Sequence, residues 1–198
     1  KVLKDAGFKP KKNLLFCAYS DEERGGSHGA LAAVMKYPCK SIVNMDGRYN
    51  QIWHCGSGGG ELKYLFHTKD TADSAKYVAK ALPVVLEAVE EFANNRKKEM
   101  NENKYYAGTI IPETSLRYMG IRAGYDCMDL DRGEVYFVFY TDKTKEEIYG
   151  ELAEIEKVLA ERLAPLGVIG DGFKAVTRFF HYVHCEPDSE DVMKMIEA

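Results

Sequence analysis

Adjacent carboxylates followed by glycines are the residues of this chain best suited to do chemistry. Asp21-Glu22-Glu23 follows an apolar run, residues 13–19, after one serine, and precedes Gly25 and Gly26 by one arginine. The run has the length and composition of a buried strand, and residues 29–35 predict a short helix. Carboxylates at such a strand-to-helix turn lie at the carboxyl edge of an α/β sheet, where these sheets bind ligands. One carboxylate can then hold a metal ion while the other moves a proton, which is the chemistry of metal-assisted hydrolysis.

A second apolar run, residues 41–45, also ends in a carboxylate, Asp46, followed by a turn glycine. Two parallel strands joined by a helix have their carboxyl ends at one edge of the sheet, so we expect Glu23 and Asp46 to lie close together. The plain alternative is a solvated acidic loop, because charged runs usually mark exposed surface.

With these residues the chain resembles metallopeptidase family 20, the di-zinc exopeptidases and amidohydrolases. The family includes carboxypeptidase G, acetylornithine deacetylase, succinyl-diaminopimelate desuccinylase and aminoacylase. Its pattern is matched by Asp21-Glu22-Glu23, Gly25-Gly26, Gly29-Ala30 and Asp46. The resemblance implies that Glu22 is the general base, that Glu23 binds one zinc ion and that Asp46 binds the other. It also implies a hydrolase that cleaves an amide or peptide bond of a small peptide or N-acyl amino acid.

The rest of the chain predicts the order strand, helix, strand, strand, helix, strand. The second helix begins with a capping box of Thr144 and Glu147, and the first helix contains Pro83, which is expected to kink it. The expected strands cover residues 61–67, 114–123, 134–140 and 174–184, and the expected helices begin at residues 74 and 144. This order describes a ferredoxin-like sandwich.

The resembling family inserts a lid domain of this kind into its catalytic domain, directly after the strand that carries the Asp. The expected fold class is therefore α/β: part of a zinc-exopeptidase-like catalytic domain, followed by a ferredoxin-like βαββαβ lid and dimerisation domain. We place the catalytic segment at residues 1–57, the lid at 58–186 and the return to the catalytic domain at 187–198. The glycines of residues 53–60 indicate a hinge between the first two.

His67 ends the first strand of the predicted lid. By resemblance this histidine reaches into the active site of the partner subunit and polarises the scissile carbonyl, a role worth about 3–4 kcal/mol in other oxyanion-stabilising groups. The alternative is a surface histidine at a strand end, and Lys63 stands where the family usually has glycine. His181 and His184 alternate across the last predicted strand, which favours structural roles for both.

Several residues of the family pattern are absent. Family members also bind zinc through a His-x-Asp motif well upstream and a further His downstream, but only 21 residues precede Glu22 and none is histidine. We therefore expect this chain to be an excerpt of a longer enzyme. The excerpt alone is expected to bind metal weakly and to be inactive. Asp126 and Tyr140 stand where the family has an Asn and an Arg that hold the substrate carboxylate. Arg117 or Arg122 could replace that clamp.

Composition limits the partners. The net charge is −4 over 198 residues, with no sustained basic stripe, so a nucleic-acid partner is not expected. Five cysteines without a Cys-x-x-Cys pair indicate reduced thiols in a cytoplasmic protein. No signal peptide and no membrane-spanning run is found, so no membrane partner is expected. The resemblance implies a homodimer formed through the lid, residues 61–184.

Two other functions are compatible with the sequence. One is a non-catalytic ferredoxin-like dimerisation or binding module with a degenerate metal site. This hypothesis would be favoured if the whole gene product lacked a His-x-Asp motif. The other is a nucleotide cradle at residues 56–60. Its glycines do not have phosphate-loop spacing, and no Gly-Lys-Ser/Thr follows them.

Overall fold

The computed structural model describes residues 2–18, 27–40, 42–43, 52–69, 72–124 and 129–197. The chain divides into two compact units, Lys1–Asn44 and Met45–Ala198. Together their helices and antiparallel strands define a mixed α/β class. Among the described residues, no helix has the length and apolar character needed to cross a membrane.

The first unit contains α1 (Val2–Asp5) and α2 (Ser27–Lys36), and α2 confirms the helix expected over 29–35. The strand predicted at 13–19 is wrong for its described part, because residues 13–18 are irregular and exposed. Phe16 is 72% exposed, and in the second apolar run Val43 is 60% exposed and irregular. A strand needs a neighbour to accept its backbone hydrogen bonds, and no strand forms in the described part of this unit.

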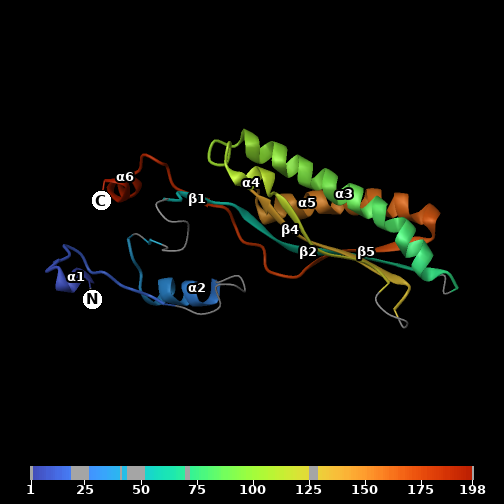
Figure 1. Ribbon diagram of the computed structural model, residues 1–198, viewed down its shortest axis with the longest axis horizontal. Coiled ribbons are helices and arrows are strands. Elements are labelled where there is room, and N and C mark those ends of the chain that lie inside the picture. The colour runs from blue at the N-terminus through green and yellow to red at the C-terminus, as the bar shows by residue number, and fades with distance from the viewer. Residues whose placement is uncertain are drawn as a thin grey trace. The chain divides into compact units, whose positions relative to one another are not determined.

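The second unit is built on a four-stranded antiparallel sheet whose strand order is β3-β4-β2-β5. Its strands are β2 (Gly58–Thr68), β3 (Leu116–Ala123), β4 (Arg132–Thr141) and β5 (Val168–Ala175). Two long helices, α3 (Ser74–Glu102) and α5 (Lys145–Leu163), cover one face of this sheet (Figure 1). The predicted order of four strands and two helices is confirmed.

The core lies between the sheet and these two helices. Alternate residues of β2, such as Leu62 and Phe66, are at most 2% exposed, as are Val135 and Phe137 of β4. They pack against the apolar stripe of α3 that the sequence indicates, which includes Val85. Each such side chain contributes about 1.5–3 kcal/mol when it leaves water. The remaining positions of each strand face away from α3 and α5.

Short elements complete the unit. They are β1 (Cys55–Gly56), α4 (Ile110–Glu113), the 3₁₀ turn η2 (Ala164–Leu166), β6 (Val183–His184) and α6 (Glu190–Ile196). Strand β1 pairs with β6, so Cys55 stands opposite His184. The chain therefore enters and leaves the four-stranded part of this unit at neighbouring positions.

The last predicted strand is misplaced. The structure has β5 at Val168–Ala175, whereas only Val183 and His184 of the predicted strand's later part are in a strand, and they pair with β1 instead. Gly170 and Gly172, which are typical of a turn, lie inside β5. The strand accommodates them because a β-bulge and a close approach of Tyr64 need residues without a side chain there.

The expected glycine hinge is also partly a strand, because Gly58, Gly59 and Gly60 begin β2. A Cβ on Gly59 would come within 2.1 Å of the Phe139 carbonyl oxygen. Glycine is therefore required there by close backbone packing rather than by flexibility. Helix α3 is longer than expected and continues through Pro83 as far as Glu102.

Candidate functional site

The catalytic carboxylates predicted from the sequence lie outside the described residues. This applies to Glu22, Glu23 and Asp46, and also to Asp126, so their proximity stays a prediction. Among the residues that the structure does describe, no group of three or more His, Cys, Asp or Glu side chains is arranged to hold a metal ion. The predicted ligands, Glu23 and Asp46, fit zinc by donor type, because zinc accepts carboxylate oxygens.

His67 lies near the carboxyl end of β2, where the sequence predicts it. It alternates with the buried residues Phe66 and Thr68 and so belongs to the sheet face away from the helices. In register it stands between Arg132 of β4 and Ile169 of β5. Its side chain is 31% exposed, which leaves part of the ring accessible from solvent.

The imidazole of His67 has one carboxylate partner that the sequence did not reveal. His67 Nδ1 lies 2.9 Å from Asp171 Oδ2, and the Asp171 side chain is 42% exposed. The two residues are 104 positions apart in the chain. Strand pairing brings them together, which no local sequence pattern predicts.

Asp171 is the extra residue of a β-bulge in β5. Phe66 pairs with Gly170 and Leu65 pairs with Gly172, so Asp171 has no partner on β2. Gly172 has φ +83°, a left-handed conformation that favours glycine. Such bulges redirect a side chain and are frequent at functional sites.

A glutamate from α5 holds the backbone beside the bulge. The Phe173 N–H donates to Glu156 Oε1 at 2.6 Å, and Glu156 is half-buried. Burial, together with the charges of Glu156 and Asp171, raises the pKa of Tyr64, which therefore stays neutral. The bulge is thus fixed both by strand pairing and by a charged group of the helical layer.

Further along the same sheet face, a buried carboxylate is neutralised by two cations. Glu134 of β4 is only 5% exposed, Lys63 Nζ lies 3.1 Å from its Oε2, and Arg122 Nε lies 3.7 Å from its Oε1. Tyr136 donates its hydroxyl to Glu61, and this hydrogen bond raises the pKa of Tyr136 to about 12. Arg122, one of the two arginines that the sequence suggests for holding a substrate carboxylate, is therefore already engaged with a carboxylate.

The other candidate, Arg117, lies over an aromatic ring. Its guanidinium carbon is 6.0 Å from the ring centroid of Tyr140. Arg117 is on β3 and Tyr140 is on the neighbouring strand β4. A cation held over a ring can still donate to a bound carboxylate at its edge.

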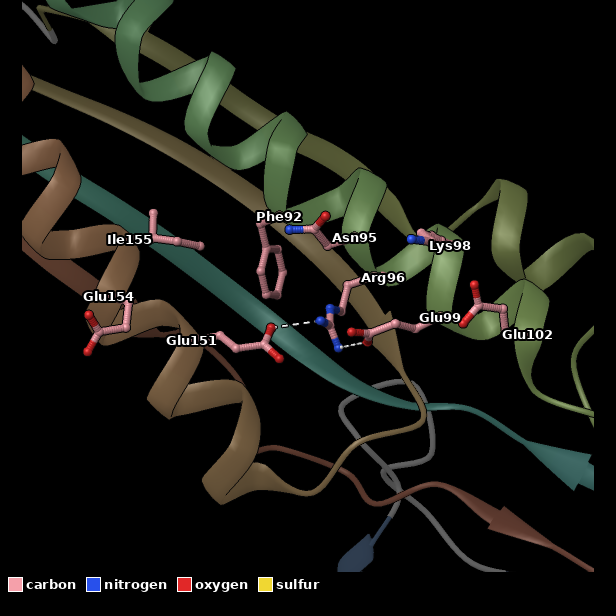
Figure 2. A pocket seen from close by; sticks show the side chains of 9 residues that line it. All are labelled: Phe92, Asn95, Arg96, Lys98, Glu99, Glu102, Glu151, Glu154 and Ile155. Atoms are coloured by element: carbon pink, nitrogen blue, oxygen red, sulfur yellow. Dashed lines mark ion pairs between the residues drawn. The ribbon is translucent and has the colours of Figure 1, made fainter.

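A hollow of about 500 Å³ lies elsewhere, between α3 and α5 (Figure 2). Arg96, only 1% exposed, stands there between Glu99 at 2.6 Å and Glu151 at 2.8 Å. Lys143 binds the same two carboxylates. The charges of the two cations and the two carboxylates balance one another, so we interpret this ion-pair cluster as a structural link between the helices.

The sequence contains one sign of this ion-pair cluster, which is a charged residue at a position where the helical pattern of α3 calls for an apolar one. Arg96 continues the apolar stripe of α3, four residues after Phe92, so it occupies a core position. A charge at such a position is retained when opposite charges from a neighbouring element are available. The apolar pattern of α3 does not predict the partner, because Glu151 belongs to α5.

Comparisons with known proteins identify no family. No protein-family model matches the sequence, and no curated protein matches it. Among solved structures, the chain is similar to the Bacillus subtilis YXEP protein, described as a dinuclear metal-binding peptidase of the M20 family. The two are 14% identical with a TM-score of 0.35, and the match covers 66% of this chain and 28% of that one. A likeness at this level assigns neither the fold nor the activity.

Proposed function

We propose that this chain is part of a metal-dependent hydrolase that cleaves an amide or peptide bond of a small peptide or N-acyl amino acid. One observation carries the proposal. Asp21-Glu22-Glu23 and Asp46 precede a βαββαβ unit, and the first strand of that unit leads to His67. The order of parts is that of metallopeptidase family 20.

The topology of the second unit supports a ferredoxin-like lid. In this sheet β2, the first strand in chain order, lies between the third, β4, and the fourth, β5, and both long helices pack on one face. The pairing of β1 with β6 supports an inserted domain, because a domain inserted into another must have its two ends close together.

Each residue has a distinct role in the proposed reaction. When bound, a pair of zinc ions supplies a nucleophilic water at neutral pH. Glu23 and Asp46 hold the ions through their carboxylate oxygens. Glu22 takes the proton of the attacking water and delivers it to the leaving amine. His67 donates a hydrogen bond to the carbonyl oxygen as negative charge develops there.

The Glu22→Gln substitution in the complete protein tests this assignment. Glutamine keeps the size of the side chain but cannot accept the proton, so turnover should fall by at least about 100-fold, the lower end of the contribution of a general base. Zinc content, measured by atomic absorption, should be unchanged. Glu154→Gln is the matched control, because the Glu154 side chain is 71% exposed on α5 and pairs only with Lys157 among the described residues. Turnover retained in Glu22→Gln would exclude the role.

The lid is also proposed to form a homodimer. Strand β3 is an edge of the sheet, and it exposes Met119 and Ile121 by 55% and 44%. An edge strand offers unpaired backbone groups to a second copy of itself. Sedimentation velocity of the second unit over a concentration series should show a dimer, and Ile121→Lys should shift it toward monomer. A strictly monomeric profile at the highest concentration would contradict the proposal.

A further inference from the structure

We infer that Asp171 is a positioning residue that holds His67 in one tautomer, with the hydrogen on Nδ1 and with Nε2 presented at the sheet face away from the helices. The inference deepens the proposed function, on which its catalytic consequence rests. The tautomer itself is a property of the chain and is measurable without turnover.

The geometry determines which nitrogen carries the hydrogen. His67 Nδ1 and Asp171 Oδ2 are 2.9 Å apart, which is a hydrogen-bond distance. An ionised carboxylate can only accept, so the imidazole nitrogen must donate. In the neutral ring Nε2 then keeps a lone pair, and only the protonated ring carries a hydrogen on both nitrogens.

The carboxylate is held in place by its backbone. Asp171 projects from the bulge between Gly170 and Gly172, and the adjacent Phe173 N–H is bonded to Glu156. A Cβ on Gly170 would lie 2.0 Å from the Tyr64 hydroxyl, so the strand packs tightly at this point. The backbone position of Asp171 is therefore set by the pairing and packing of β5.

The other charged groups near the imidazole are engaged elsewhere. Arg132 stands opposite His67 on β4, but its side chain is 65% exposed and its Nε lies 3.8 Å from Asp129 Oδ1. On the β5 side the residue in register with His67 is Ile169. Two residues further along β4, Glu134 is paired with Lys63 and Arg122. Among the described side chains, Asp171 is thus the charged group that is bonded to the ring.

This tautomer decides what His67 can do. As a neutral ring it offers Nε2 as an acceptor, which suits a substrate N–H and not a carbonyl oxygen. As an imidazolium it offers Nε2–H as a donor, which is the form that carbonyl polarisation needs.

The test is long-range proton–nitrogen NMR of the chain labelled with ¹⁵N in histidine, recorded at a pH where His67 is neutral. His67 should show a protonated Nδ1 and an unprotonated Nε2. In Asp171→Asn the acceptor-only carboxylate is replaced by an amide that can donate as well as accept, so the preference for a protonated Nδ1 should weaken and the pattern should shift toward a protonated Nε2. Asp171→Glu should restore a protonated Nδ1, and Asp129→Asn, which alters the neighbour of Arg132, should leave the pattern unchanged.

Two results would overturn the inference: a protonated Nε2 in the neutral unmodified chain, or the same tautomer in Asp171→Asn with the other backbone signals unchanged. Because Asp171→Asn turns Nε2 of the neutral ring from an acceptor into a donor, it should change kcat in the complete enzyme and leave KM nearly unchanged, as for a group that acts in the transition state. If the tautomer shifts and kcat does not, the positioning role stands and the catalytic role proposed for His67 fails.

Discussion

At the residue scale, the most informative side chains are the charged ones that the fold buries. Glu134 and Arg96 are each at most 5% exposed although both are charged. Each has opposite charges within ion-pair distance from a neighbouring strand or helix. A buried charge without such partners would cost several kcal/mol, so these pairings constrain how the elements assemble.

Gly170 provides a prediction at the same scale. Gly170→Ala should lower the free energy of unfolding by about 1–3 kcal/mol, because its Cβ would lie 2.0 Å from the Tyr64 hydroxyl oxygen. Tyr64→Phe removes that oxygen, so the double variant should recover part of the loss. Urea unfolding of the two single variants and the double variant measures the coupling.

The control for this cycle is Gly150→Ala. Gly150 is exposed in α5, and a Cβ there meets nothing within 4 Å. Alanine is a better helix former than glycine, so this change should stabilise the chain by up to about 1 kcal/mol. Equal effects of the alanine at positions 170 and 150 would contradict the close approach at Gly170.

At the element scale, α5 begins with the capping box that the sequence predicts. The Thr144 hydroxyl accepts from the Glu147 N–H at 3.3 Å, and the Thr144 N–H donates to Glu147 Oε2 at 2.8 Å. Both pairings are local, within three residues, and for this reason the sequence is sufficient to predict them.

The capping box predicts a dependence of stability on pH. Hydrogen bonds from the hydroxyl and the backbone N–H of Thr144 lower the pKa of Glu147 below its ordinary value of 4.5. A lowered folded-state pKa stabilises the fold above the ordinary value, and this contribution is lost as pH falls through the folded-state value. Thermal unfolding of the unmodified chain and of Glu147→Gln should differ at pH 7 and converge near pH 2. A difference that is independent of pH would contradict the charged cap.

At the scale of the whole molecule, the two units differ in how much of their apolar surface is covered. In the first unit Leu15 and Phe16 are 60% and 72% exposed and lie in irregular backbone, whereas Phe137 and Phe139 of β4 are at most 1% exposed. Strand β4 is also paired on both sides, with β2 and β3. Protection of backbone amides should therefore be unequal along the chain.

Hydrogen–deuterium exchange of this chain measures that difference. Amides of residues 13–18 should exchange within seconds, because no backbone partner holds them in the described structure. Amides of β2 and β4 should be the slowest, since they open only with the core. Protection of 13–18 comparable to that of β4 would show that the first apolar run forms a strand after all.

The order of elements in the second unit could be predicted from the sequence because each pattern arises within a few residues. Strands β2 and β4 are indicated by the alternation of buried and partly exposed residues, and α3 by the apolar stripe from Val78 to Phe92. The start of α5 is indicated by Thr144 and Glu147. At the candidate site, the position of His67 at the end of β2 is confirmed. The carboxylates Glu22, Glu23 and Asp46 remain predictions.

The tertiary structure alone decided which segments meet. It placed β5 at Val168–Ala175, left residues 13–18 without a sheet, and brought Asp171 to His67 across 104 residues of chain. The physical reason is that a strand's apolar pattern records its own burial but not the identity of its neighbour. Register, bulges and cross-strand partners are properties of the pair, and they come into existence only when the sheet forms.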